Sequence, residues 1–195
     1  MPYSIAPTDN LCYPGTTVLI NKPGLRSQAA LDEAESAFTA LHTLEIETEP
    51  CTEPFTFSFY CRLHYRLFCD LYDWAGTPRT IDIAKKGTQF YPAENLITMS
   101  EAKFRYLQDM HEFRNIPRSR FIRELVDFYH ELNMLHPFRD GNGRTQRLFF
   151  TLLIRRAGYD ISFADSDADL LMMATIFAAQ GVKDHLRQFF EEAVI

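Results

Sequence analysis

The residues best suited to chemistry lie in one short segment, residues 136–147, which reads His-Pro-Phe-Arg-Asp-Gly-Asn-Gly-Arg-Thr-Gln-Arg. His136 carries a side chain whose usual pKa lies near neutrality, which makes it a candidate general base. Asp140 offers a carboxylate, and Mg²⁺ commonly takes one or two protein carboxylates together with phosphate oxygens and water. The segment therefore combines a candidate base with a candidate metal ligand.

The second half of this segment predicts an anion site. Gly141 and Gly143 permit backbone conformations closed to other residues, and Asn142 tolerates such conformations. A helix is expected to begin directly afterwards, so its N–H groups and the positive end of its dipole face the loop. Arg144 and Arg147 lie three residues apart and project to one side. Because arginines are unfavourable at a helix N-terminus, a multiply charged phosphate is the natural occupant.

Together these residue types predict nucleotidyl or phosphoryl transfer. The histidine would take a proton from an attacking hydroxyl, while the loop amides and the arginines would stabilise charge on the phosphates. The alternative is a plain corner between two helices, with turn glycines, a capping aspartate and surface arginines. Gly-Asn-Gly alone would favour the corner, but a corner does not need a histidine, an aspartate and two arginines in one loop.

Helices are the elements that must position this loop. Pro137 disfavours an α conformation at the residue before it, so the preceding helix should end at His136. Residues 118–135 show the cleanest amphipathic pattern in the chain, and residues 144–157 are apolar nearly all round, which is typical of a central buried helix. Further helices are expected over residues 27–46, 55–72, 94–112, 168–179 and 182–193.

The remaining segments complete an all-α prediction with one exception. In the first expected helix the apolar positions recur every three or four residues, with polar residues such as Glu35 between them: Leu31, Ala34, Phe38, Leu41 and Leu44. Residues 1–24 are rich in Pro and Gly and predict an extended, turn-rich arm. Residues 79–91 alternate around a Lys-Lys-Gly turn and predict the one short β-hairpin. We therefore expect residues 1–195 to form a single helical bundle with one hairpin.

Composition excludes several classes of protein. The chain has 195 residues, with 20 Lys and Arg against 26 Asp and Glu, and a net charge of −6 argues against direct nucleic-acid binding. The four cysteines form no C-x-x-C pair, so zinc ribbons and thioredoxin-like motifs find no support. No signal peptide and no run of 18 apolar residues is present, so we expect a cytoplasmic protein without a membrane partner. His64 lies in an aromatic stretch and is interpreted as a core residue.

Residues 136–147 match without a gap the signature of Fic-domain proteins, H-x-F-x-[DE]-G-N-G-R-x-x-R. Asp73-Trp74-Ala75-Gly76, with Arg79 after it, resembles the family's segment before its β-hairpin flap. Residues 13–19 (Tyr-Pro-Gly-Thr-Thr-Val-Leu) resemble the start of bacterial Fic toxins. The resemblance extends from about Leu11 to the C-terminus and implies a Fic-fold helical bundle with a hairpin flap.

The resemblance implies adenylyl transfer, in which AMP moves from ATP to a hydroxyl side chain of a target protein and pyrophosphate leaves. His136 would be the base, Phe138 would be a core residue that sets the loop, and Asp140 would bind Mg²⁺. The alternatives that stay open are phosphoryl or other nucleotidyl transfer on the same fold, and a phosphate-binding interaction module without catalysis.

The resemblance also assigns the phosphate contacts. Gly141, Asn142 and Gly143 would form the anion hole for the α- and β-phosphates. Arg144 would hold the γ-phosphate and Arg147 the β-phosphate.

The hairpin resembles the family's flap, which covers the nucleotide and registers a target segment by strand addition. Lys86 and Gly87, near its tip, would contact the nucleotide. The returning residues would dock the target: Thr88, Gln89 and Phe90.

Regulation follows from a pattern that the sequence lacks. Many Fic proteins inhibit themselves with a helix of pattern [ST]-x-x-x-E-[GN], whose Glu pairs with the equivalent of Arg144. The only Glu followed by Gly or Asn is Glu94, and Phe90 stands four residues before it. The resemblance therefore implies the toxin of a toxin–antitoxin pair, held by a small antitoxin that carries the inhibitory helix. Subunits of type II topoisomerases are the first targets to expect.

Overall fold

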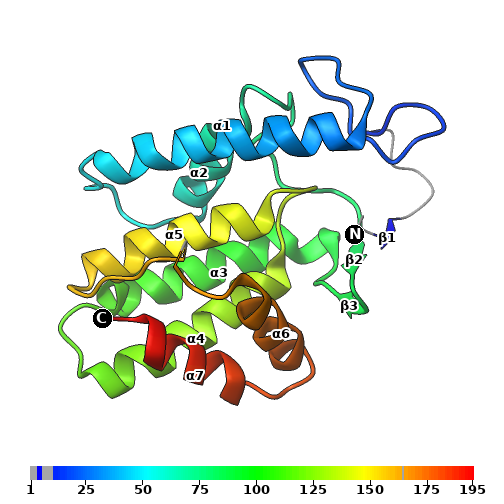
Figure 1. Ribbon diagram of the computed structural model, residues 1–195. Helices are drawn as coiled ribbons and strands as arrows, with labels where there is room; N and C mark the ends of the chain where they lie inside the picture. The colour runs from blue at the N-terminus through cyan, green and yellow to red at the C-terminus, as the bar shows by residue number, and fades with distance from the viewer. Residues whose placement is uncertain (1–3, 6–10, 164) are drawn as a thin grey trace.

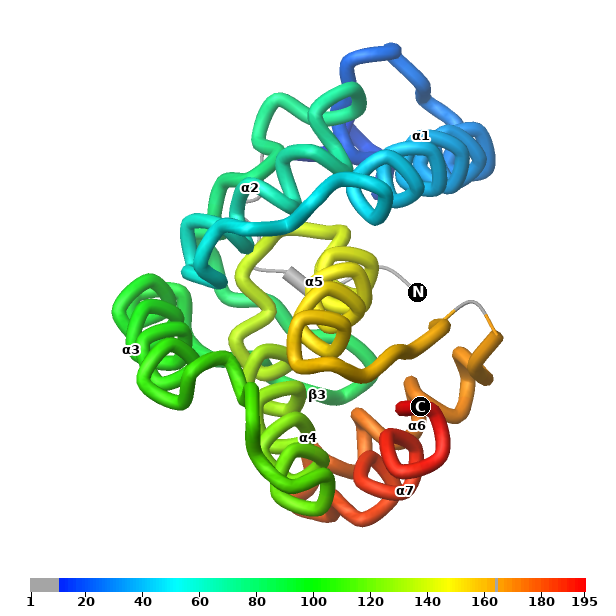
Figure 2. Tube along the Cα trace, turned by 90° about the vertical axis from the view of Figure 1, so that its left-hand side faces the viewer, coloured from blue at the N-terminus to red at the C-terminus, as the bar shows by residue number. Residues whose placement is uncertain are grey.

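The central element of the molecule is α5 (Asn142–Arg156), which the other helices surround (Figures 1 and 2). This computed structural model describes residues 4–5, 11–163 and 165–195. Helix α5 is buried along most of its length, as its all-round apolar sequence predicts. It begins two residues earlier than expected, at Asn142, so the Gly-Asn-Gly run is itself the start of the helix.

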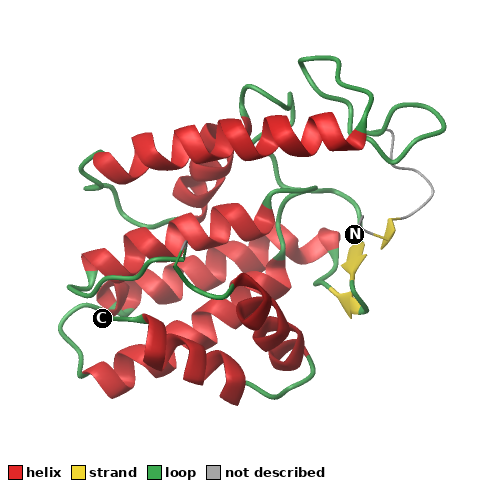
Figure 3. Cartoon of the chain, viewed as in Figure 1, coloured by secondary structure: helices red, strands yellow, loops and turns green. Residues whose placement is uncertain are grey.

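Most of the described chain is helical, as predicted (Figure 3). Around α5 lie α1 (Gln28–Thr48), α2 (Phe57–Phe68), α3 (Leu96–Asp109), α4 (Arg118–Leu135), α6 (Ala168–Ala179) and α7 (Asp184–Ala193). Two short 3₁₀ turns, η1 (Ala93–Asn95) and η2 (His111–Phe113), flank α3. None of the helices described is both long and apolar enough to span a bilayer.

Aromatic side chains form the centre of the core. The ring of Phe149, on α5, has four aromatic neighbours with centroids 5.3 to 5.5 Å away: Phe55, Tyr60, Phe104 and Phe150. All five rings are at most 2% exposed, and burying each contributes about 1.5–3 kcal/mol. This packing accounts for much of the high aromatic content.

The inner face of α1 differs from the predicted apolar stripe. Leu31 is buried as expected, but Leu41 and Leu44 are 53% and 67% exposed. Glu35 and Thr39 occupy the buried face instead, so the helix turns polar groups toward α2 and α5.

The predicted hairpin is present and gains a third strand. Strands β2 (Ile83–Lys85) and β3 (Thr88–Gln89) pair antiparallel, and β1 (Ser4–Ile5) pairs with the free edge of β2. Lys86 and Gly87 have φ values of 51° and 79°, the two left-handed conformations of a tight hairpin turn. Of the expected N-terminal arm, residues 1–3 and 6–10 lie outside the described residues, and a bridge between Cys12 and Leu19 folds residues 11–20 back on themselves.

Candidate active site

Residues 136–141 form the loop between α4 and α5. His136 adopts a left-handed conformation with φ 41° and caps α4, so the predicted end of that helix is confirmed. The buried Arg79 donates to four carbonyl oxygens around the loop, those of Ile81, Tyr91, Leu135 and His136, at 2.5–3.2 Å. The backbone N–H of Arg79 also donates, to the Pro137 carbonyl oxygen, at 2.8 Å. One arginine thus ties the base of the hairpin to the loop.

The His136 imidazole is held in one orientation. Its Nδ1 lies 3.1 Å from the Asn133 carbonyl oxygen, so Nδ1 carries the proton and Nε2 keeps its lone pair. The ring stacks on Phe90, with centroids 3.7 Å apart and planes 9° from parallel. Burial, together with the nearby charges of Lys85 and Arg79, lowers the His136 pKa to about 3. His136 is therefore neutral at pH 7 and able to accept a proton.

Phe138 and Asn142 lock the loop onto the core. Phe138 is completely buried and stacks on His64 with centroids 3.8 Å apart. The Asn142 side chain accepts from the Phe138 N–H at 2.9 Å and donates to the Phe138 carbonyl at 2.8 Å. Because its side chain is committed to Phe138, Asn142 can face an anion only with its backbone N–H.

The two glycines of the loop differ in whether the fold requires them. Gly141 has a φ of 76°, and a Cβ there would lie 2.4 Å from the Phe68 ring, so both backbone and packing require glycine. Gly143 has no positive φ, and the nearest heavy atom to its Cβ position is Arg147 Nη1 at 3.4 Å. Neither the backbone conformation nor the packing of the described residues therefore requires glycine at position 143.

Asp140 has the chemistry that Mg²⁺ prefers. Its Oδ1 accepts a hydrogen bond from the Gly141 N–H at 2.6 Å, which turns the carboxylate beside the first turn of α5. A half-buried carboxylate next to an anion site fits a hard cation that completes its shell with phosphate oxygens and water.

The two arginines of α5 are placed differently. Arg144 Nη2 lies 2.7 Å from Oε2 of Glu35, and its guanidinium stands 4.7 Å from the centre of the Phe68 ring. The Tyr72 hydroxyl donates to the other oxygen of Glu35. Arg147 is half-buried and has its guanidinium beside Gly143. Arg147 therefore flanks the start of α5 directly, whereas Arg144 shares its donors with a carboxylate of the same chain.

Glu35 and Arg79 contact the site in ways that the sequence does not predict. Glu35 was assigned to the polar face of its helix, yet it lies four residues after the buried Leu31 and four before the buried Thr39. That spacing was the signal that could have found it. Arg79 was noted only within a family segment, and its contacts to four carbonyl groups have no pattern in the sequence.

The flap residues are not all near the loop. Lys86 is exposed, and its ammonium contacts Met172 of α6. A small hollow is lined by residues 86–89 of the flap, Met134 of α4, and Ala179 and Gln180 at the end of α6. Thr88 and Gln89 are accessible, but Phe90 is buried against His136. Phe90 therefore packs under the His136 ring, and its side chain is not available to dock a target segment.

A second group of possible metal ligands lies away from the loop, between α1 and the end of α2. His42, Cys69 and Asp70 bring their donor atoms within 4.8 Å of one another. His42 already has hydrogen-bond partners on both ring nitrogens, Glu45 at 3.0 Å and Asp70 at 2.9 Å. These contacts account for the cluster, so Asp140 stays the metal ligand of interest.

A model of the Fic/DOC family matches residues 54–154, just over half of the chain. The chain is 31% identical to the probable protein adenylyltransferase Fic of Salmonella typhimurium, over 95% of its own length and 92% of that protein. It is 34% identical to the probable protein adenylyltransferase y4lH of Sinorhizobium fredii, over 89% of each chain. The chain therefore belongs to the Fic/DOC family, and the predicted resemblance is confirmed.

Solved structures agree with this assignment. The structure of the BepC protein of Bartonella tribocorum, with bound AMPPNP, superposes with a TM-score of 0.89 at 25% identity, over 95% of this chain and 96% of that one. The predicted Fic fold is thus confirmed. That neighbour also holds an ATP analogue, which is the class of ligand expected for the loop.

Proposed function

We propose that this chain is a protein adenylyltransferase that moves AMP from ATP to a hydroxyl side chain of a target protein. One observation carries the proposal: a neutral, oriented histidine base adjoins a helix N-terminus whose first six residues include a glycine and two arginines. The adenylyltransferase names of the relatives and the AMPPNP bound to BepC support the same reaction.

In this mechanism His136 Nε2 removes the proton from the target hydroxyl, whose oxygen attacks the α-phosphorus of ATP. A new P–O bond forms to the target, the bond between the α-phosphorus and the bridging oxygen breaks, and pyrophosphate leaves with that electron pair. The N–H groups of Asn142, Gly143 and Arg144 have no carbonyl partner inside the helix, so they can stabilise the charge on the phosphate oxygens.

The arginines would hold the outer phosphates. Arg147 would bind the β-phosphate beside Gly143, and Arg144 would reach the γ-phosphate with the N–H groups that do not contact Glu35. Asp140 would hold Mg²⁺, which supplies positive charge to the leaving pyrophosphate when bound. The flap residues Lys86 to Gln89 would cover the nucleotide and align the target segment.

The biological role that we propose is that of a cytoplasmic toxin with a separate antitoxin. The inhibitory pattern is missing from the sequence, and an antitoxin helix would bring a carboxylate to the site's arginines. Type II topoisomerase subunits are the first targets to assay. Expression of the chain alone should stop growth, and co-expression with the neighbouring reading frame should restore it. Harmless expression of an active chain would remove the toxin role but not the transfer reaction.

Incubation of the chain with a cell lysate and ATP tests the reaction. With ATP labelled on the α-phosphate, a protein band should become labelled, and the band should disappear with His136→Ala. With ATP labelled on the γ-phosphate, no band should appear. Label from the γ position only would mean phosphoryl transfer, and binding of ATP without any label would mean an interaction module.

A further inference from the structure

His64 is a buried histidine whose two ring nitrogens are both engaged. Nδ1 lies 2.8 Å from the Gly76 N–H, which can only donate, so Nδ1 must be the unprotonated acceptor. Nε2 therefore carries the proton and donates to the Asp140 carbonyl oxygen at 3.0 Å. With an acceptor at Nδ1 and a donor at Nε2, the ring carries one proton and is held in a single neutral tautomer.

The ring itself cannot turn. It is fully buried and stacks on Phe138 with centroids 3.8 Å apart and on Phe68 with centroids 4.7 Å apart. Phe68 is also the ring that a Cβ at Gly141 would strike, and His64 Nε2 would lie 3.1 Å from the same Cβ. His64 thus sits directly beneath the turn at which α5 begins.

The hydrogen bond to Asp140 has a consequence for that residue's side chain. The peptide group between Asp140 and Gly141 is planar, so holding its carbonyl oxygen fixes the direction of its N–H. That N–H, of Gly141, donates to Asp140 Oδ1 at 2.6 Å. A continuous chain of contacts therefore runs from the His64 Nε2–H, through one peptide plane, to the Asp140 carboxylate.

We infer that His64 is a positioning residue that sets the direction of the Asp140 carboxylate and of the first turn of α5. The inference deepens the proposed function, because it rests on Asp140 as the Mg²⁺ ligand. His64 touches neither nucleotide nor metal and acts only through the peptide between Asp140 and Gly141. Groups that orient a metal ligand in this way typically affect metal affinity about 10- to 100-fold.

Two substitutions separate the two hydrogen bonds. His64→Gln places an amide N–H near the position of Nε2 and can still donate to Asp140. His64→Asn places an amide oxygen near the position of Nδ1 and can still accept from Gly76, but it loses the donor to Asp140. His130→Gln is the matched control, since His130 is half-buried on α4 and its Nδ1 has no hydrogen-bond partner within the described part of the chain.

The first readout is the amide NMR signal of Gly141 in protein free of metal and nucleotide. The hydrogen-exchange rate of this amide should stay at the wild-type value in His64→Gln and in the control, and should rise in His64→Asn. The second is calorimetric ATP binding with and without Mg²⁺. The increase in ATP affinity that Mg²⁺ causes should persist in His64→Gln and should be about 10-fold or more smaller in His64→Asn.

Equal behaviour of the Gln and Asn variants in both readouts would overturn the inference and leave His64 a core residue. If His64→Asn does not fold, nitrogen NMR of the wild-type ring decides, because a proton on Nδ1, or on both nitrogens, would also overturn it. Failure of the proposed function looks different: wild-type ATP binding would then be absent or independent of Mg²⁺, while the Gly141 signal would still report the His64 contact.

Discussion

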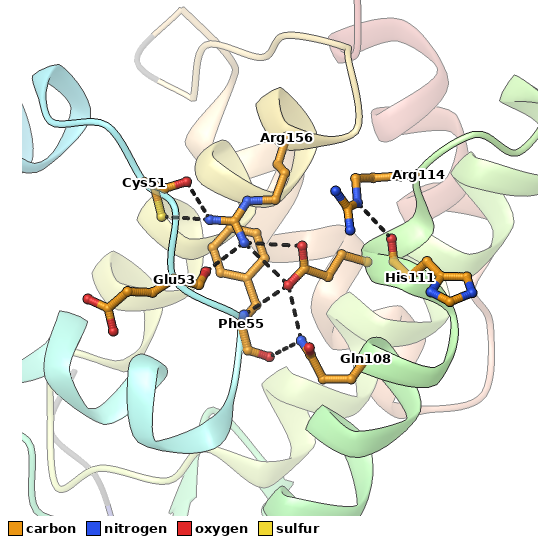
Figure 4. A network of polar contacts seen from close by, with 8 residues as sticks. Cys51, Glu53, Phe55, Gln108, His111, Arg114 and Arg156 are labelled. Atoms are coloured by element: carbon orange, nitrogen blue, oxygen red, sulfur yellow. Dashed lines mark hydrogen bonds and ion pairs between the residues drawn. The ribbon is translucent and has the colours of Figure 1, made fainter.

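Both ends of α5 carry arginines, but the arginines at the two ends differ in how completely their guanidinium groups are paired. At the C-terminal end the Arg156 guanidinium donates to the Cys51 and Glu53 carbonyl oxygens and to the Glu112 carboxylate, and stacks 3.6 Å from the Phe55 ring centre (Figure 4). At the N-terminal end Arg144 contacts one carboxylate and Arg147 lies beside a bare glycine.

The Glu112 carboxylate in this C-terminal network has further hydrogen-bond donors besides Arg156. Glu112 accepts from the Phe55 N–H at 3.0 Å and from Gln108 at 3.1 Å (Figure 4). Burial raises the Glu112 pKa, but these hydrogen bonds and Arg156 outweigh burial and lower it. A cation is electrostatically favoured at a helix C-terminus and unfavoured at an N-terminus. We infer from this difference that the fully paired arginine at the C-terminal end stabilises the fold, whereas the incompletely paired arginines at the N-terminal end are suited to bind an anion.

The largest loss of stability is expected when the cation at the C-terminal end of α5 is removed. Arg156→Met leaves the buried Glu112 without its cation, which should lower the free energy of unfolding by about 3–5 kcal/mol. Urea denaturation measures this loss. ATP affinity of the folded variant, measured by calorimetry, should stay at the wild-type value. A variant of wild-type stability with weakened ATP binding would reverse the roles of the two ends.

The next effect separates the two loop glycines. Gly141→Ala should lower the free energy of unfolding by about 3 kcal/mol, since it combines a strained φ with overpacking against Phe68. Gly143→Ala should raise it by about 0.5–1 kcal/mol and yet weaken ATP binding about tenfold or more, because the added Cβ would keep the phosphate from approaching the backbone N–H closely enough for a charge-assisted hydrogen bond. Denaturation and calorimetry on both variants check this. Equal ATP affinity of Gly143→Ala and wild type would remove the phosphate from the start of α5.

Lowering the pH should destabilise the fold through the two buried histidines near the N-terminal end of α5. Burial lowers the pKa of both His64 and His136 to about 3, so between pH 6.5 and 3 the unfolded chain binds more protons than the folded one. Stability should therefore fall as the pH drops below 6.5, by about 1.4 kcal/mol per pH unit for each histidine. Denaturation at pH 6.5 and 5.5 should show a smaller slope for His64→Gln than for wild type. Identical slopes would mean that His64 is not neutral through burial.

The smallest expected change is in ATP affinity and concerns Arg144, which contacts the Glu35 carboxylate through one nitrogen. Glu35→Gln keeps an oxygen for Arg144 and removes a negative charge from beside the phosphates. ATP affinity should rise about twofold to tenfold, in keeping with about 1 kcal/mol for one nearby charge. Glu35→Ala loses the oxygen as well, and should bind ATP no better than wild type. Calorimetry on both variants decides, and weaker binding by Glu35→Gln would show that the charge of Glu35 is needed to orient Arg144.

The sequence predicted the architecture because its strongest patterns are local. The amphipathic residues 118–135 and the apolar residues 144–157 both formed helices within two residues of the expected bounds. The hairpin was predictable from alternation around Lys86 and Gly87. The third strand, Ser4–Ile5, was not, because its pairing with β2 joins segments that lie far apart in the chain.

The loop residues were predictable as a set because their chemistry is concentrated in one segment. Their supports were not, because each reaches the loop from another element. Glu35 looked like a surface residue, and its partner stands on α5. His64 was interpreted as a core residue, and only the structure shows which backbone group its Nε2 holds. Phe90 was assigned to the target edge of the flap and instead packs beneath His136, since its apolar ring gains more from burial.

One transfer assay compares the two ends of α5 directly. The rate of label transfer from α-labelled ATP to a lysate protein should be measured for wild type, His136→Ala and Arg156→Met, each normalised to its folded fraction. We expect His136→Ala to lose transfer by about 100-fold or more, because its general base is missing, and Arg156→Met to keep the wild-type rate. Transfer that survives in His136→Ala, or that is lost equally in Arg156→Met, would show that the N-terminal end of α5 is not the catalytic one.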